Sequence, residues 1–224
     1  MRMPFLGSVL SLFLAAPVAY AAAPWVEGQH YLLIEPAPAD STAAAHPEVT
    51  EVFSYGCPFC AQFNATAKQL QASLPAKAQF SYVSASFLPA EDWPMFQRAY
   101  CTAQILGIAA QTHDALFDAV WKSGELATID YASRRLKRPL PTLEDAARVY
   151  NRLTGVSVDK FLTAAQSPAV DAKVHAADEF VRAYRVDSTP SIIVDRKYRV
   201  NLQAVSGAGE LIDLVKWLIA QDSK

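Results

Sequence analysis

Hydrophobic positions along the chain follow two periods, and the change between them divides the sequence into three parts. Runs rich in β-branched and aromatic residues predict strands over residues 31–35, 49–54 and 79–84. Between the second and third runs, apolar residues at helical spacing predict a helix over residues 58–74. The first part of the chain therefore contains a strand, a helix and a strand, which together make a βαβ unit.

The middle of the chain, residues 91–185, has helical periodicity throughout. Five helices are predicted there, over residues 94–106, 111–122, 142–153, 157–165 and 169–185. Strand patterns return at 191–194 and 198–202, and an amphipathic helix over 210–220 follows them. Two β/α halves on either side of a helical block predict an α/β fold, in which one mixed β-sheet is flanked by helices and carries an inserted all-helical domain.

The first 21 residues have a pattern of their own. Arg2 is their only charged residue, an apolar run extends from Phe5 to Val18, and residues 19–21 (Ala-Tyr-Ala) are small at the two positions that signal peptidase reads. This pattern predicts a cleaved secretory signal. The alternative is an uncleaved anchor, for which the apolar run is short, because a spanning helix needs about 20 apolar residues.

The predicted division of the chain is a signal peptide over 1–21, the first part of the α/β domain over 22–90, the helical insertion over 91–185 and the second part of the domain over 186–224. We expect cleavage after Ala21 and export to a compartment in which disulfides persist. The chain has 224 residues, 52% of them hydrophobic, and a formal net charge of −2. This composition supports a sizeable core, and the charge gives no reason to expect nucleic acid or an anionic lipid surface as a partner.

The segment 53–63, FSYGCPFCAQF, places Cys57 and Cys60 three positions apart at the predicted start of a helix. Pro58 fits the first helical position, where its missing N–H costs nothing. A metal site is disfavoured because none of the four histidines, nor Cys101, is spaced to complete a set of four ligands. A purely structural disulfide is also disfavoured, since closing so short a loop limits the unfolded chain very little.

Redox exchange is the interpretation that has a mechanism. A thiolate at a helix N-terminus faces unpaired backbone N–H groups and the positive end of the helix dipole, which lowers its pKa. A disulfide that holds such a sulfur opens readily when another thiolate attacks it. We expect Cys57 to be exposed and attacked, and Cys60 to be more buried and to resolve the intermediate. Cys101 is expected to be a small buried hydrophobic residue, with a regulatory or intermolecular thiol as the weaker alternative.

Two further elements bear on this pair. Glu51 lies on the strand that leads to Cys57, where apolar neighbours suggest burial, and a buried carboxylate is usually functional. The alternative is an acidic residue on a solvated strand face. A carboxylate beneath a dithiol can accept or relay the proton that Cys60 loses or gains. Pro190 follows Thr189 just before a predicted strand, and composition alone favours a trans bond there.

Together these residues resemble the DsbA family of periplasmic thiol:disulfide oxidoreductases, which have the thioredoxin fold. The resemblance rests on the segment EVFSYGCPFC from Glu51 to Cys60, on Thr189–Pro190 and on the ending SIIVDRKYRVN, and it extends from about residue 28 to the C-terminal helix. It implies that Cys57 and Cys60 form a redox-active disulfide, with Cys57 as the nucleophile. It also implies that Glu51 is a buried acid beneath the pair and that Pro190 is a cis-proline facing it.

The same resemblance indicates how substrates bind. Thr189 would offer backbone hydrogen bonds to a substrate segment in a short β-augmentation, and Pro58 and Phe59 are the other expected substrate-binding residues. Phe59 stands where the best-known motif of the family has histidine. We therefore expect a less acidic Cys57 and a less oxidising pair than in the histidine form, although the thiol pKa should remain below its ordinary value of about 8.5. An exposed aromatic cluster near Phe59, with Trp93 or Phe87, would make an apolar groove.

We predict an enzyme, a thiol:disulfide interchange protein of the periplasm that introduces disulfide bonds into newly exported proteins. The resemblance implies a DsbB-like membrane quinone reductase as the reoxidant. We expect a monomer with no metal, no cofactor and no nucleic-acid partner. Three alternatives remain open: a dedicated periplasmic reductase or isomerase-type relative, a CxxC metallochaperone for Cu(I), and a chaperone-like binder whose helical block holds peptides.

Overall fold

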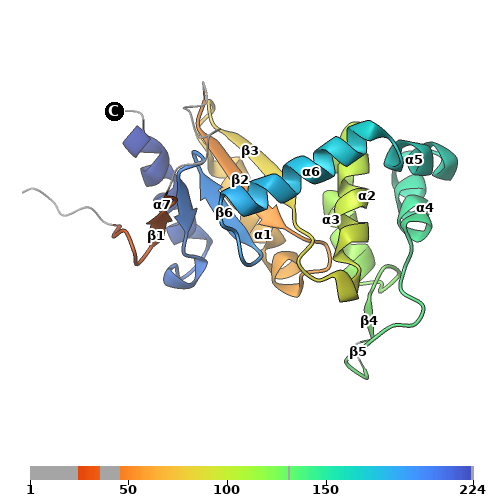
Figure 1. The fold of residues 1–224 in the computed structure, drawn as a ribbon. Coiled ribbons are helices and arrows are strands. Elements are labelled where there is room, and N and C mark those ends of the chain that lie inside the picture. Colours follow the sequence, from red (N-terminus) through yellow and green to blue (C-terminus); the bar gives the residue numbers. More distant parts are fainter. Residues whose placement is uncertain (1–24, 36–45, 131, 223–224) are drawn as a thin grey trace, which may run out of the picture.

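Five strands form one mixed β-sheet, in the order β1-β7-β6-β2-β3 (Figure 1). The computed structural model describes residues 25–35, 46–130 and 132–222, and the predicted signal peptide lies outside these residues. The strands are β1 (Tyr31–Leu33), β2 (Glu48–Phe53), β3 (Gln79–Ser84), β6 (Ser191–Val194) and β7 (Tyr198–Val200). Strand β2 pairs parallel to β3 and antiparallel to β6, so the two distant parts of the chain meet along β2.

Helices cover both faces of this sheet. On one face lie α1 (Pro58–Ser73) and α7 (Ala208–Asp222), whose apolar side chains form a buried cluster with Val49, Ile192 and Val194. On the opposite face, Val52 and Ile193 pack with Tyr184, which directly follows α6 (Pro168–Ala183). Because strand residues alternate between the two faces, Glu51 and Phe53 lie on the same side as Val49, toward α1.

A block of helices lies between β3 and β6 in the sequence and at one end of the sheet in space (Figure 1). It comprises α2 (Trp93–Ile105), α3 (Ala109–Trp121), α4 (Leu143–Thr154), α5 (Val158–Ala165) and α6. Helix α6 runs from this block back across the sheet and so connects the helical block with the sheet (Figure 1). The predicted fold class, a mixed sheet flanked by helices with an all-helical insertion, is confirmed.

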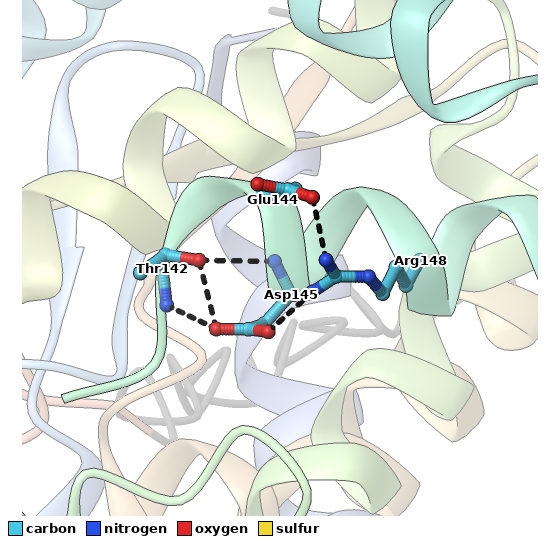
Figure 2. Close-up of polar contacts among 4 residues, drawn as sticks. All are labelled: Thr142, Glu144, Asp145 and Arg148. Carbon is cyan, nitrogen blue, oxygen red and sulfur yellow. Dashed lines mark hydrogen bonds and ion pairs between the residues drawn. The ribbon is translucent and has the colours of Figure 1, made fainter. Parts of the chain in front are cut away.

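The helices α4 and α5 begin within one residue of the predicted positions because side-chain hydrogen bonds cap their first turns. At the start of α4, the Thr142 hydroxyl accepts from the Asp145 N–H (3.2 Å), and the Asp145 carboxylate accepts from the Thr142 N–H (2.8 Å). Figure 2 shows this capping box, with Arg148 one turn later bonded to both Asp145 and Glu144. Ser157 caps α5 through the Lys160 N–H. Such caps supply partners for backbone donors that a helix leaves unpaired.

Several features differ from the sequence prediction, among them the strand predicted over 31–35, which ends at Leu33. A hairpin of β4 (Ile129–Asp130) and β5 (Arg135–Leu136) connects α3 to α4, and its two-residue strands are too short to show a period. The predicted strand 198–202 ends at Val200, because the Asn201 side chain accepts a hydrogen bond from the Gln203 N–H (3.2 Å) and turns the chain into a short 3₁₀ helix.

Candidate active site

Cys57 occupies the N-cap of α1, immediately after β2. Its backbone is extended (φ −89°, ψ 117°), and Pro58 follows at the first helical position. The Cys57 N–H donates to the carbonyl of Ser54 (3.1 Å), which closes the turn between strand and helix. Cys57 Sγ accepts a hydrogen bond from the Cys60 N–H (3.4 Å), as a capping side chain does. The predicted placement of this cysteine at the helix start is confirmed.

The helical block contacts the CxxC loop directly through Trp93. A Cβ atom on Gly56 would lie 2.5 Å from Trp93 Nε1, so only glycine fits beside this indole. Trp93 is 4% exposed, and its N–H donates to the Glu91 carboxylate (3.2 Å). The expectation that Trp93 could join an exposed aromatic cluster with Phe59 is therefore wrong, because its ring is buried against the loop instead.

Both cysteines of the motif are buried thiols, and they are not bonded to each other. Cys57 is 3% exposed and Cys60 is 0% exposed. The expectation that Cys57 is exposed is therefore wrong, although the order of burial is the expected one. Cys57 is enclosed because its thiol donates to the Thr189 carbonyl (3.3 Å) and packs in the same apolar cluster as Tyr55 and Trp93.

The two thiols differ strongly in acidity. A hydrogen bond from the Cys60 thiol is the largest influence on Cys57 and lowers the pKa of Cys57 to about 6, despite burial. Hydrogen bonds from the Thr189 side chain and from the backbone N–H groups of Cys60 and Phe59 act in the same direction. Burial, followed by the bond to Cys57, raises the pKa of Cys60 well above its usual range. At neutral pH the pair therefore holds one thiolate and one thiol.

Glu51 lies on β2 and is shielded from the solvent that would stabilise its charged form. It is 1% exposed, it stands opposite Tyr82 of β3, and its Oε2 has no hydrogen-bond partner among the described residues. Burial, and after it the charge of Cys57, raises the pKa of Glu51 to about 8. This placement rules out the solvated strand face. A carboxyl group that stays protonated near neutral pH can give up or take a proton at small free-energy cost.

The loop before β6 faces the start of α1. Its Thr189–Pro190 bond is cis, as the resemblance implies and against composition, and Arg138–Pro139 is a second cis bond. The loop also lines a groove of about 680 Å³, whose other wall includes Phe59 and Phe63 of α1. Phe59 is 66% exposed at the rim of this groove. The structure therefore brings Thr189, Pro190 and Phe59 together beside Cys57.

His113 of α3 is a buried neighbour of the site that the sequence did not reveal. It is 6% exposed, and its Nδ1 shares a hydrogen bond with the Tyr55 hydroxyl (3.1 Å). Its ring lies 4.8 Å from that of Phe53 and 4.3 Å from that of Tyr82. Burial lowers the pKa of His113 to about 4, so the ring is neutral at physiological pH. A single histidine within a helix has no sequence signal, since only the packing of α3 on the sheet brings it here.

Cys101 lies in the middle of α2, away from the motif, and is 2% exposed. Burial raises the pKa of its thiol to about 11, in keeping with a small hydrophobic residue. Among the described residues, no group of three or more His, Cys, Asp or Glu side chains could hold a metal ion. Over the same part of the chain, no helix combines the length and apolarity that crossing a membrane requires.

The fold and the site together define a class of protein. A thioredoxin-like sheet carries an acidic thiol at a helix N-terminus, a second thiol one turn later and a cis-proline loop opposite them. That arrangement is built for exchange between thiols and disulfides. The protein is a thioredoxin-fold thiol:disulfide oxidoreductase.

Comparison with known proteins assigns the family. A thioredoxin family model matches residues 42–214. DsbA of Azotobacter vinelandii is 30% identical over 177 residues, which cover 78% of this chain and 74% of the relative. DsbA of Pseudomonas aeruginosa strain PAO1 is 27% identical over 223 residues, or 99% and 97% of the two chains. The crystal structure of DsbA from Xylella fastidiosa has a TM-score of 0.74 at 27% identity and covers 89% of this chain and 98% of its own. The chain belongs to the DsbA family.

Proposed function

We propose that this protein is an oxidant, which donates a Cys57–Cys60 disulfide to cysteine-containing proteins after their export. The low pKa of Cys57, about 6, is the observation that carries the proposal. A sulfur that is stable as an anion is a good leaving group, so the disulfide that holds it is easily opened and the dithiol is favoured. The enzyme therefore ends each cycle reduced and its substrate oxidised.

The exchange proceeds in two steps. A substrate thiolate attacks Cys57 Sγ, the Cys57–Cys60 bond breaks, and Cys60 leaves as a thiolate and takes up a proton. A second substrate thiolate then attacks the substrate sulfur of the mixed disulfide, and Cys57 leaves as a thiolate. The substrate gains one disulfide and loses two electrons, which the enzyme holds as its dithiol. Cys57 is the better leaving group and Cys60 the resolving sulfur because of their opposite pKa shifts.

Glu51 is proposed as the proton donor and acceptor for Cys60. Its raised pKa, about 8, keeps the carboxyl protonated while the disulfide is attacked. The charge of Glu51 is among the causes that raise the pKa of Cys60, which supports a position near this thiol. Oε2 has no partner among the described residues, so it is free to form a transient hydrogen bond. Direct transfer or transfer through one water molecule fits this role.

Substrate segments are proposed to bind beside Thr189 and Pro190, with Phe59 and Pro58 on the other side. An extended segment would pair with the backbone of the cis-proline loop as a short added strand. The exposed ring of Phe59 and the groove next to it supply apolar contact for unfolded chains, which present apolar side chains. These contacts recognise backbone and general hydrophobicity, which suits a broad range of substrates.

The cellular setting is proposed from the sequence and the family. Removal of residues 1–21 would release the mature chain, with a thioredoxin-like domain over 22–90 and 186–224 and a helical insertion over 91–185, into the periplasm. A DsbB-like membrane quinone reductase would accept the two electrons and restore the disulfide. We propose that the protein acts as a monomer and has no metal or cofactor of its own.

The equilibrium of the dithiol with a glutathione redox buffer tests the direction of the reaction. We expect a reduction potential above that of thioredoxin, which is about −270 mV. A potential at or below that value would favour the alternative role of a dedicated reductase and defeat the oxidase. A Phe59→His variant sharpens the measurement, because restoring a donor beside the thiolate should make the pair more oxidising than the natural sequence.

A Cys57→Ser variant separates the proposal from the chaperone-like alternative. Oxidation of a reduced substrate peptide should stop completely, since the attacked sulfur is gone. If the helical block instead holds peptides as the main activity, suppression of substrate aggregation would survive this change unaltered. Metal analysis of the purified protein addresses the metallochaperone, whose case is weak because Met95 is the only methionine after residue 3.

A further inference from the structure

The hairpin between α3 and α4 carries a concentrated positive charge. Residues 129–139 contain four basic side chains and one acidic, a net charge of +3 in a chain whose total is −2. The basic residues are Arg134, Arg135, Lys137 and Arg138, which we call the basic hairpin. The net charge of the whole chain, −2, does not reveal this cluster.

The three arginines of the basic hairpin are available to a partner. All three are exposed, and none of their side chains has a hydrogen bond or ion pair with any described residue. In contrast, the neighbouring Arg148 and Arg152 are each paired with carboxylates. Arginines that lack a carboxylate partner, gathered within five positions, present an uncompensated positive field.

The hairpin is held in a defined position. The Lys137 N–H donates to the Thr128 carbonyl (2.8 Å), and Lys137 Nζ donates to the Gly124 carbonyl (3.0 Å). At the tip, the Asp130 carboxylate accepts from both the N–H and the hydroxyl of Ser133 (2.7 and 2.8 Å). Asp130 therefore has its charge engaged within the hairpin, and Lys137 is partly committed to its base. The free charge belongs to the three arginines.

This charge lies at the end of the molecule that carries the CxxC motif. The Trp121 indole at the end of α3 donates to the carbonyl of Tyr55 (2.7 Å), two residues before Cys57. The hairpin begins at Ile129, eight residues after Trp121. Figure 1 shows β4 and β5 standing out from the body of the protein, next to the helical block. Whatever the basic hairpin binds is thereby brought near the active-site end.

We propose that the basic hairpin binds anionic phospholipid surfaces and holds the CxxC end of the enzyme close to a membrane. Arginine suits this role because its planar guanidinium binds phosphate in two places at once. Four basic residues in a short segment match the clusters that adsorb to anionic lipid by charge alone. Ala132 and Ser133, in the turn between β4 and β5, are small and exposed.

The shape of the hairpin favours a lipid surface over an acidic polypeptide. An extended peptide needs a groove or a strand edge that supplies several backbone hydrogen bonds, and strands of two residues supply very few. A protruding, convex tip meets a broad charged surface without such pairing. The Cα atoms of Arg134 and Arg138 are at most roughly 14 Å apart, which is close to the Debye length in dilute salt, so the three arginines act on that surface together.

Sedimentation with lipid vesicles tests the proposal. We expect the purified protein to bind vesicles of phosphatidylcholine mixed with phosphatidylglycerol, not phosphatidylcholine alone, and to be released by salt. The triple variant Arg134→Gln, Arg135→Gln, Arg138→Gln should bind on the order of 100-fold more weakly, from the contribution of each charge near an anionic surface. The matched control, Lys77→Gln, Lys160→Gln, Lys216→Gln, removes the same charge from exposed positions elsewhere and should change binding only a few-fold.

Three results would overturn the proposal. Equal binding to both kinds of vesicle would show that charge is not recognised, and equal loss in both triple variants would show that the hairpin has no special role. Binding of polyglutamate with no binding of anionic vesicles would assign the hairpin to an acidic polypeptide instead. The biological role of the basic hairpin rests on the proposed function, but its binding to anionic lipid does not. Exchange with a soluble peptide should be unchanged in all variants, and its absence in the natural protein would count only against the oxidase.

Discussion

Cys57 and Cys101 are both buried, yet the regions that hold them shift the thiol pKa in opposite directions. Cys57 is 3% exposed with a pKa lowered to about 6, and Cys101 is 2% exposed with a pKa raised to about 11. At the start of α1, hydrogen bonds from the Cys60 thiol, from Thr189 and from backbone N–H groups all converge on one sulfur. In the middle of α2, the backbone N–H groups already donate to carbonyls of the helix, so burial determines the pKa of Cys101.

The difference shows that donors, and not exposure, make a reactive cysteine here. A capping position is where backbone N–H groups remain unpaired, so a sulfur placed there gains them at no cost to the helix. The same region also holds Glu51, whose burial raises its pKa to about 8. The active-site end therefore combines a thiol whose charged form is stabilised with a carboxyl group whose charged form is disfavoured, and the Cys101 region has neither.

Among changes that would reduce the difference between the Cys57 and Cys101 regions, removal of the Glu51 carboxyl is expected to have the largest effect. Its folded-state pKa is raised from 4.5 to about 8, so its stabilising contribution is fully present below pH 4.5 and is lost as the pH rises through 8. That loss amounts to about 5 kcal/mol in the reduced protein. A Glu51→Gln variant should not show this loss of stability between pH 4.5 and 8. Urea denaturation at a series of pH values measures the free energy of unfolding of both proteins.

Glu179→Gln is the matched control for this change. Glu179 is an exposed residue that lines the cavity beside Cys101, so its replacement should leave the pH dependence of unfolding as it is. If Glu51→Gln kept the same slope between pH 4.5 and 8 as the natural protein, the carboxyl would not be held protonated, and its proposed role in proton transfer would be lost.

The reduced and oxidised forms should diverge in stability as the pH rises. The pKa of Cys57 falls from an ordinary 9.0 to about 6 in the folded dithiol, so the reduced form gains stability above pH 6, up to pH 9. The gain is about 4 kcal/mol at most, and solvent in the adjoining groove screens part of it. The disulfide has no such thiol, so the gap between the two unfolding free energies should widen. Cys101→Ser should preserve this widening. Cys57→Ser forms no disulfide, and as a dithiol-free protein it should show no gain in stability between pH 6 and 9. A gap that stays constant with pH in the natural protein would contradict the acidic thiol.

Much of the fold could be predicted because its elements have strong local signals. The helices α4 and α5 begin at Thr142 and Ser157, whose hydroxyls cap them, and Pro58 marks the first turn of α1. The strands β3 and β6 have the predicted bounds. The hairpin β4–β5 could not be predicted, since its strands are two residues long and too short to show a hydrophobic period.

The site was predictable in its residue types but not in its environment. Glu51 has buried neighbours on both faces of β2, so no alternation in the sequence reveals which way it points. The enclosure of Cys57 depends on Thr189, which lies 132 positions away. Trp93 and His113 reach the site only because the helical block packs against the sheet. Long-range packing determines each of these positions, and no short pattern in a single sequence reveals it.

Alkylation by iodoacetamide at pH 7 offers a direct test of the two thiols. Their pKa values imply thiolate fractions that differ by roughly 10⁴-fold in favour of Cys57. The more basic Cys101 thiolate is the stronger nucleophile, which offsets about 10²-fold of this. We therefore expect Cys57 to react on the order of 100-fold faster in the reduced protein, read out by mass spectrometry of the two peptides. Equal rates would mean that the hydrogen bonds around Cys57 do not act on its charge.

The smallest predicted effect separates the contributions to the acidity of Cys57. The Cys60 thiol is its largest stabilising donor, so Cys60→Ala should raise the pKa of Cys57 by about one unit, the worth of one hydrogen bond to a charged group. Cys60→Ser keeps a hydrogen-bond donor at a similar position and should raise the pKa of Cys57 less. The pH dependence of Cys57 alkylation gives both values. If alanine and serine shifted the pKa equally, a side-chain donor at position 60 would have no effect, and the thiolate would be stabilised by Thr189 and the backbone N–H groups of Cys60 and Phe59.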